Sequence, residues 1–169
     1  MTRTITYEDL FYAADDAQKR FDGYEHACWA FLRDLRDGME VYLKAPAGKL
    51  YWRRYSDRET TKELEHKGVV RLSASRHMVL YDDARYGAHL HMDIGKKQLM
   101  VPLRVKKTDN GFAVWLGEEK HEVGLGSKED LERLIVQIVT IVKDHLETQF
   151  EAFLKGQPAV LGFPGMVDR

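Results

Sequence analysis

An antiparallel sheet is predicted most clearly by residues 88–125, which read AHLHMDIGKKQLMVPLRVKKTDNGFAVWLGEEKHEVGL. From Ala88 to Ile94, apolar side chains alternate with polar ones, which is the period of a strand with one buried face. The dipeptide Asn110-Gly111 is the strongest hairpin signal in the chain. These features predict a β-meander, in which successive strands are joined by tight turns.

The register of these hairpins follows from where the loops are placed. Loops at Lys96-Lys97, Asn110-Gly111 and Glu118-Glu119 set apolar residues opposite one another throughout. Pro102 lacks a backbone N–H and therefore predicts an edge or a bulge. The predicted cross-strand pairs are Ile94 with Leu99, Met92 with Val101, Leu90 with Leu103, Val105 with Leu116, Val114 with Val123, and Phe112 with Leu125.

A long amphipathic helix is predicted before the sheet. Thr6 is a suitable N-cap, and the acidic residues Glu8 and Asp9 favour the first turn. The helix is expected to end at Asp37-Gly38. One face of it repeats at spacings of three and four residues, through Leu10, Ala14, Ala17, Phe21, Tyr24, Cys28, Phe31 and Leu35.

A second long helix is predicted after the sheet, from Ser127, with Asp130 completing a capping pattern, to a stop at Gly156. Its main apolar stripe is Leu131, Leu134, Ile135, Ile138, Val142, Leu146, Phe150 and Phe153. Val136, Val139 and Ile141 extend the apolar surface around the helix. Such a helix needs cover beyond the sheet, so we expect either the first helix or a second subunit to pack on it.

Shorter elements are expected between the first helix and the meander. Residues 39–45 and 50–55 predict a hairpin around Pro46-Ala47-Gly48, and residues 58–67 predict a short helix. Further strands are expected at 69–74 and 77–82. The predicted fold class is therefore α+β, with an antiparallel β-meander of about 6–8 strands flanked by two long amphipathic helices. We expect a single domain over residues 1–155 and an extended or flexible tail over residues 156–169.

The composition is typical of a soluble cytoplasmic protein. A chain of 169 residues can bury roughly 70% of its unfolded surface. Cys28 is the sole cysteine, which excludes an intramolecular disulfide and favours a reducing compartment. Its place on the apolar stripe favours a small buried hydrophobe over a reactive thiol. We expect neither a signal peptide nor a membrane span.

Charge is distributed unevenly along the chain. Residues 1–43 carry a formal charge of −4, residues 44–107 carry +8, and residues 108–169 carry −5. A basic sheet could bind an anion such as nucleic acid. Alternatively, acidic helices neutralise the sheet within the fold or between two subunits, and this second interpretation is the one favoured here.

The first candidate site is a histidine strand. His89, His91 and Asp93 project from one face, because alternate strand residues share a face. Two imidazoles and one carboxylate can form a facial triad for a divalent metal. In the predicted register, however, His89 lies opposite Arg104, whose positive charge opposes a bound cation, and a polar sheet face explains the pattern as well.

The second candidate site is an aromatic and basic segment. Aromatic rings interleaved with arginines suit base stacking and phosphate contacts on single-stranded nucleic acid. The segment comprises Tyr51, Trp52, Arg53, Arg54 and Tyr55. An amphipathic strand with outward arginines explains the same residues.

No motif for catalysis is present, whether GxSxG, P-loop, GxGxxG, CxxC or HExxH. The sequence therefore favours a non-catalytic protein that binds a protein partner or a second copy of itself, without a cofactor, through Val136, Val139 and Ile141. One alternative is a metal-binding protein or metal-dependent enzyme that uses the histidine strand. A further alternative is anion or nucleic-acid binding by the basic sheet.

Overall fold

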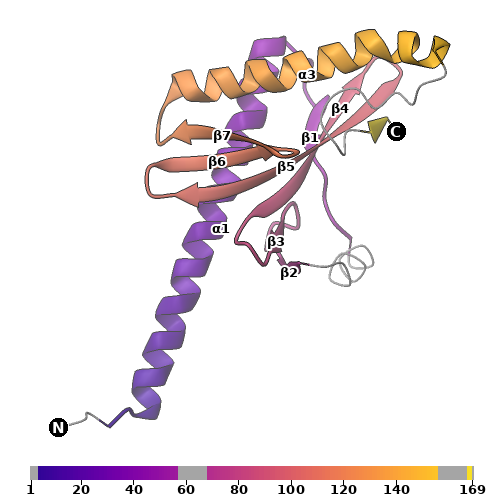
Figure 1. Cartoon of the computed structure of the whole chain (residues 1–169). Coiled ribbons are helices and arrows are strands. Elements are labelled where there is room, and N and C mark those ends of the chain that lie inside the picture. Colours follow the sequence, from indigo (N-terminus) through magenta and orange to yellow (C-terminus); the bar gives the residue numbers. More distant parts are fainter. Residues whose placement is uncertain (1–3, 57–67, 156–166, 169) are drawn as a thin grey trace.

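A meander of antiparallel strands forms the centre of the fold, as predicted (Figure 1). The computed structural model describes residues 4–56, 68–155 and 167–168. The predicted short helix at 58–67 lies outside these residues. The described elements are α1 (Tyr7–Leu43), β1 (Leu50–Trp52), β2 (Val69–Leu72), β3 (Val79–Tyr81), β4 (Tyr86–Ile94), β5 (Lys97–Thr108), β6 (Gly111–Leu116), β7 (Glu119–Gly124), α3 (Lys128–Leu154) and β8 (Val167–Asp168).

Strands β2 to β7 lie side by side in sequence order, and two short strands add to the edges of the central pair. Strand β1 pairs with residues 90–92 of β4, and β8 pairs with Leu99 and Met100 of β5. On the same side of β5, β6 pairs with residues 104–108. Pro102 falls between the two partners, which agrees with the expected edge position.

The three predicted hairpin registers are each wrong by two residues, and a shift of two keeps the paired side chains on their predicted faces. Leu125, predicted to face Phe112, instead lies beyond the end of β7 and is 74% exposed. The two-residue loops are Gly95-Lys96, Asp109-Asn110 and Gly117-Glu118, each one residue earlier than predicted. Gly95 and Gly117 take positive φ angles of 61° and 65° at the first loop position, which glycine adopts without steric penalty. The observed pairs include Ile94 with Lys97, Met92 with Leu99, Leu90 with Val101, Val105 with Val114, and Phe112 with Val123.

Helix α1 begins as predicted and ends later than predicted. The Asp9 amide donates to Thr6 Oγ1 (3.2 Å), and the Thr6 amide donates to the Asp9 carboxylate (2.9 Å). The helix passes through Gly38 and stops at Lys44, which adopts the left-handed conformation. A Cβ atom at Gly38 would lie 2.7 Å from Cδ1 of Ile135 on α3, so this glycine allows two helices to approach closely rather than ending one.

The predicted hairpin over residues 39–45 and 50–55 is therefore wrong. Met39 is fully buried one helical turn after Leu35, and it continues the apolar stripe of α1. In the second half of the predicted hairpin, Leu50–Trp52 alone forms a strand, and it pairs with β4 rather than with residues 39–45. Packing of the stripe overrides the turn signal of Gly38.

Both long helices cover the same face of the sheet. The buried sheet residues share one parity in each strand, as in Leu90, Val101 and Val114, and they pack with residues of α1 and α3 in one core. Within the described ranges, neither helix offers an apolar run that could cross a bilayer. The opposite sheet face, on which neither helix packs, carries the histidine strand and is called the open face here. The helix residues of the core are Cys28, Phe31, Leu32, Leu35, Met39, Leu134, Ile135, Ile138 and Val142.

Candidate functional site

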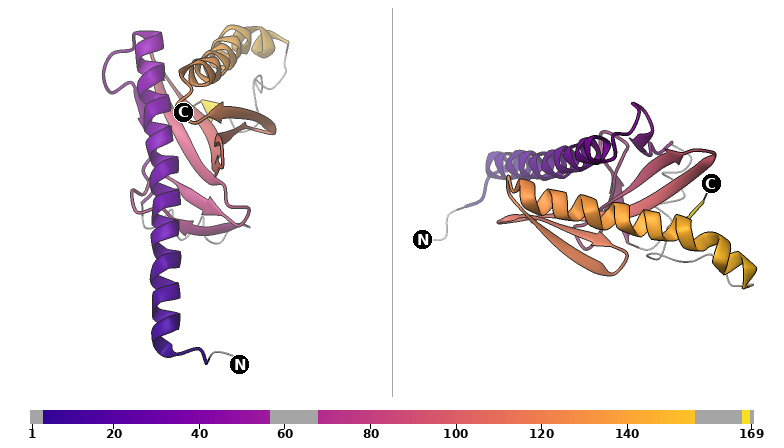
Figure 2. Two further views of the ribbon diagram at one scale, coloured as in Figure 1. Left: turned by 90° about the vertical axis from the view of Figure 1, so that its left-hand side faces the viewer. Right: turned by 90° about the horizontal axis from the view of Figure 1, so that it is seen from above.

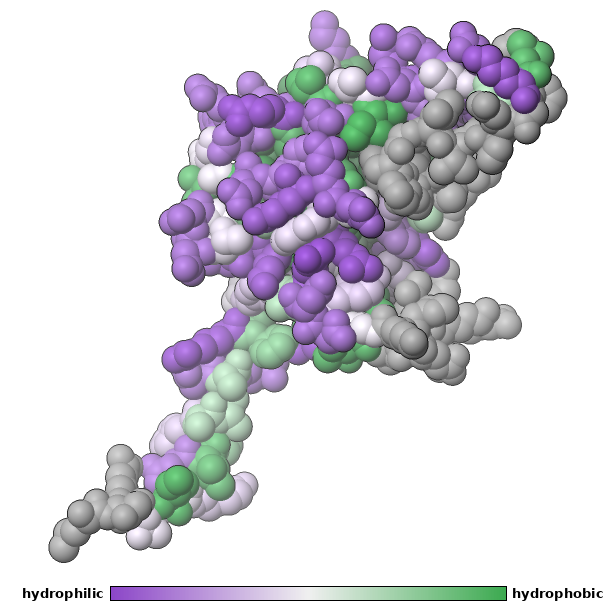
Figure 3. Space-filling model, viewed as in Figure 1, coloured by the Kyte–Doolittle hydropathy of each residue, from purple (hydrophilic) through white to green (hydrophobic). Residues whose placement is uncertain are grey.

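The N-terminal half of α1, residues 7–23, extends beyond the sheet and is called the arm here (Figures 1 and 2). Within α1, full burial begins at Glu25 and Cys28. In the arm, the exposed fraction is 59% for Leu10, 58% for Phe11 and 44% for Phe21. Figure 3 shows apolar surface along this projecting segment. Isolated exposed apolar residues are common, but a contiguous run along a helix marks an interaction surface.

The arm's apolar stripe is continuous with the stripe that packs on the sheet. Tyr7, Leu10, Ala14, Ala17 and Phe21 occupy alternating spacings of three and four, a pattern found both in helices that pack on a sheet and in paired helices. The charges lie to the side of it. Lys19 Nζ lies 2.7 Å from the Asp15 carboxylate and Arg20 Nε lies 2.9 Å from the Asp16 carboxylate, which satisfies these charges within the helix.

An apolar hollow lies where the arm leaves the body of the protein. It measures about 240 Å³ and is lined by Arg20, Phe21, Tyr24, Leu80 and Ala84. The hydroxyl of Tyr24 donates to the carbonyl of Ala84 at 2.6 Å. The stripe of the arm therefore runs directly into a depression large enough to accept an apolar side chain.

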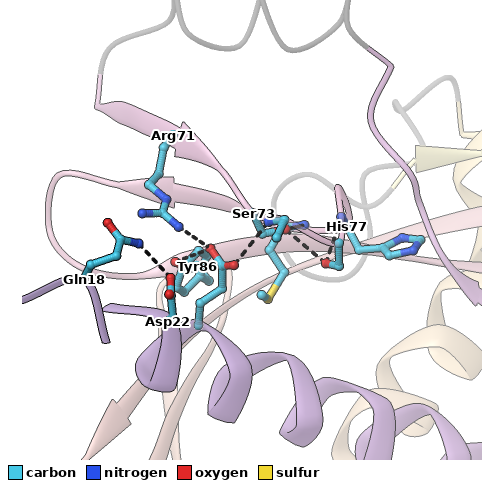
Figure 4. Close-up of polar contacts among 10 residues, drawn as sticks. Gln18, Asp22, Arg71, Ser73, His77 and Tyr86 are labelled. Carbon is cyan, nitrogen blue, oxygen red and sulfur yellow. Dashed lines mark hydrogen bonds and ion pairs between the residues drawn. The ribbon is translucent and has the colours of Figure 1, made fainter. Parts of the chain in front are cut away.

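Glu25 fixes the point at which the arm begins. Its carboxylate accepts hydrogen bonds from Arg71 (3.0 Å), the hydroxyl of Tyr86 (2.9 Å) and the amide of Ala74 (3.2 Å). Figure 4 shows Arg71 and Tyr86 approaching α1 from the sheet, with Ser73 close by. Burial, and then the bond to Glu25, raises the pKa of Tyr86. A buried carboxylate with three donors holds the helix in one position.

The predicted self-association residues on α3 are only partly available. Val136 is 42% exposed, whereas Val139 and Ile141 are half-buried and pack against the core. The cover predicted for this helix is supplied in part by α1, through the contact of Gly38 with Ile135. Self-association at these three residues stays a prediction.

The histidine strand lies on the open sheet face. His89, His91 and Asp93 alternate along β4 as predicted, but His91 is buried and its ring packs 5.3 Å from that of Tyr51. The register changes the neighbours: His89 lies opposite Pro102, His91 opposite Met100, and His121 opposite Val114. Nη1 of Arg53 lies 3.4 Å from Nδ1 of His89, and this cation would oppose a metal. Among the described residues no three histidine, cysteine or acidic side chains cluster, and metal binding stays a prediction.

The aromatic and basic segment is divided between the two sheet faces. Trp52 is buried in the core and its Nε1 donates to the carbonyl of Leu32 at 3.1 Å. Tyr51 and Arg53 lie on the open face beside the histidine strand, and the guanidinium of Arg53 lies over the ring of Tyr55 at 5.0 Å. Arg54 is exposed. The five predicted residues therefore do not form one surface, and anion or nucleic-acid binding by this segment stays a prediction.

A cleft on the open face brings together residues that the sequence analysis did not combine into a site. It measures about 610 Å³. Its walls include two arginines and two aromatic residues from three strands and one turn, and only the correct register places them side by side. The lining residues are Tyr81, Arg85, Gly87, His89, Pro102, Leu103, Arg104, Trp115, Gly117 and Glu118.

No protein family, curated protein or solved structure is found to match the chain. The candidate surfaces are therefore judged by their geometry and chemistry. Of the features that sequence reasoning missed, Glu25 carried a detectable signal, because a carboxylate beside a buried apolar stripe requires a partner. The cleft had no comparable signal in the sequence, because its lining comes from separate strands and from a turn.

Cys28 and Tyr24 predict a loss of stability at high pH. Burial raises the pKa of the Cys28 thiol from its ordinary value of 9.0 to about 11, and that of Tyr24 from 10.0 to about 12. The folded chain therefore holds these protons more tightly than the unfolded chain does. Their contribution to stability is complete below about pH 9 and falls as the pH rises through 11.

We expect the free energy of unfolding to fall by roughly 2 kcal/mol between pH 8 and pH 11 on account of Cys28. Urea titrations at the two pH values measure this change. The variant Cys28→Ala should show a smaller fall over the same interval. An identical fall in both proteins would contradict the role of the buried thiol.

Proposed function

We propose that the protein acts by binding rather than by catalysis, and that it associates with a second copy of itself through the arm. The observation that supports this proposal is the exposed apolar stripe of the arm, where Leu10 and Phe11 are each more than half exposed. An apolar helical face that is uncovered in the single chain gains free energy when it is covered.

The order of small and large residues favours antiparallel pairing of two arms. Ala14 and Ala17 lie at the centre of the stripe, with bulky Leu10 on one side and Phe21 on the other. If Ala14 of one copy faces Ala17 of the other, Leu10 of each copy faces Phe21 of its partner. The two bodies then lie at opposite ends of the pair and do not collide.

Charge also favours the antiparallel arrangement. The first turn of the helix carries Glu8 and Asp9 at the free end of the arm. A parallel pair would place the two acidic first turns side by side, whereas an antiparallel pair separates them. The tip of one arm also reaches the apolar hollow beside Phe21 of the other.

A double substitution in the stripe tests the proposal. The unmodified protein should have a native mass of about twice the chain mass of 19.6 kDa. The variant Leu10→Glu/Phe11→Glu should return the mass to that of one chain, because it places one carboxylate of each arm in the paired seam and a second beside it. Light scattering after size exclusion, at several protein concentrations, measures the mass.

Two control variants locate the interface. Tyr12 is 62% exposed on the opposite side of the same helical turn, so Tyr12→Glu should leave the mass unchanged. Val136→Glu tests the surface of α3 in the same way. A single-chain mass for the unmodified protein, or loss of the dimer in Val136→Glu alone, would reject pairing through the arm.

We also infer a cytoplasmic location for the protein. The support is Cys28, which is buried as a free thiol, and the lack of any second cysteine with which it could form an intramolecular disulfide. Proteins of oxidising compartments more often carry disulfides.

A further inference from the structure

The cleft on the open sheet face is built around one row of cross-strand neighbours. Arg104 of β5 lies directly between Gly87 of β4 and Trp115 of β6, and Lys120 of β7 follows Trp115. Gly87 has no side chain, so Arg104 can extend over β4 to reach Tyr81. A Cβ atom at Gly87 would lie 2.6 Å from the ring of Tyr81. The glycine therefore makes room for the floor of the cleft.

Two guanidinium groups lie on aromatic rings at the walls of the cleft. Cζ of Arg104 is 4.1 Å from the ring centre of Tyr81, and Cζ of Arg85 is 3.9 Å from that of Trp115. Stacking on a ring holds a guanidinium in place while leaving donors along its edge. Nε of Arg85 lies 3.2 Å from the carboxylate of Asp83, which further fixes this arginine.

The lining combines these cations with the carboxylate of Glu118, the imidazole of His89 and the ring of Pro102. Pro102 lies on the same sheet face as Arg104, and Glu118 is the acidic residue of the lining. Fixed guanidinium edges suit a phosphate, and guanidinium planes suit a stacked base. A carboxylate suits the exocyclic amino group of such a base.

We propose that this cleft binds a nucleoside monophosphate whose base carries an amino group. The phosphate contacts the edges of Arg85 and Arg104, and the base stacks against one of the two guanidinium–ring pairs. The volume of about 610 Å³ lies within the range of roughly 300–1,000 Å³ that holds small organic ligands. It exceeds what an inorganic anion requires.

The balance of charge in the cleft favours a monophosphate over a long polyanion. Glu118 and Asp83 offset part of the charge of Arg85 and Arg104, and both carboxylates would repel further phosphates. A single-stranded nucleic acid needs a continuous basic path, and on this face Glu122 forms an ion pair with Lys120 at 2.9 Å. The concave, partly neutralised site therefore suits one nucleotide.

Isothermal titration of the full chain with adenosine monophosphate tests the proposal. We expect saturable binding of one nucleotide per chain, with adenosine and inorganic phosphate each binding at least about tenfold more weakly. The variant Arg104→Gln should weaken binding by about tenfold or more, because it removes a charged donor. Lys106→Gln, a change on the same strand and the same face but outside the cleft, should leave the affinity unchanged.

Several results would overturn the proposal. These are the lack of saturable binding, equal affinity for inorganic phosphate, or an unchanged affinity in Arg104→Gln. Tighter binding of a ten-nucleotide deoxyadenosine strand would instead assign the face to single-stranded nucleic acid. The variant Gly87→Ala supplies an independent test. Its added Cβ atom displaces the ring of Tyr81, so the affinity for adenosine monophosphate should fall by about tenfold although no charge is removed.

Discussion

Replacement of Gly111 by alanine should lower the free energy of unfolding by about 3–4 kcal/mol. Gly111 has a φ angle of 152°, which side-chain-bearing residues rarely adopt. An added Cβ atom would also overlap the carbonyl oxygen of Val123 and lie 2.8 Å from the amide nitrogen of Leu125. Both contacts are with backbone, so no side-chain rotation can relieve them, and β6 must separate from β7.

Urea denaturation measures this effect, and Gly23 provides a matched control. Gly23 lies in the helical arm with nothing within 4 Å of an added Cβ atom. There the same substitution should raise stability by about 0.5–1 kcal/mol, because alanine has the higher helix propensity. Equal effects at the two positions would show that the β6–β7 contact tolerates a side chain.

Replacement of Glu25 by alanine should lower the free energy of unfolding by about 3 kcal/mol. The change leaves the fully buried Tyr86 without its acceptor and removes the ionic partner of Arg71. The side chain of Arg71 is 33% exposed, so water can solvate its charge in part. This solvation keeps the expected loss near the lower end of the range for a broken buried pair.

Asp22 supplies the control for Glu25, because it lies one turn earlier on the same helix. Its carboxylate is exposed and accepts a hydrogen bond from Gln18 at 2.8 Å (Figure 4). The variant Asp22→Ala should change stability by less than about 0.5 kcal/mol. Thermal denaturation of both variants compares the buried contacts of Glu25 with the surface contact of Asp22. Similar losses of stability in the two variants would contradict a special role for Glu25.

The sequence could predict which face of the sheet each side chain lies on, but it could not predict the register in which the strands pair. Alternation in residues 88–94 predicts which side chains face the core, and the structure places Ala88, Leu90 and Met92 there, while Ile94 at the strand end is exposed. A shift of two residues returns each side chain to the same face, so apolar pairing cannot distinguish the true register from its neighbour. In two of the three hairpins a glycine, Gly95 or Gly117, takes a positive φ at the first loop position, and the sequence alone did not reveal which residues would do so.

The ends of α1 show where local signals compete with packing. The capping pair of Thr6 and Asp9 is local and was predicted correctly. Gly38 is a stop signal by composition, yet it is retained inside the helix because α3 packs against it. The apolar stripe likewise identified one helical face without revealing that the sheet covers only its second half.

Among the candidate sites, those that depend on a local pattern could be predicted, and those that depend on long-range contacts could not. The alternation of His89, His91 and Asp93 is a local property, and they lie along one strand as expected. The contacts of Glu25 with Arg71 and Tyr86, and those of Arg104 with Tyr81, join residues that are distant in sequence. Such contacts depend on the register and on how the helix crosses the sheet, so the sequence could not supply them.

Both long helices lie on one face of the sheet, and the cleft opens on the other. Ligand in the cleft and a second copy on the arm would therefore not compete for the same surface. An antiparallel pair of arms would carry its two clefts at opposite ends, on bodies related by a twofold axis. The assembly would then be bivalent, and a partner that presents two copies of the ligand could bind both clefts with an avidity that one chain cannot provide.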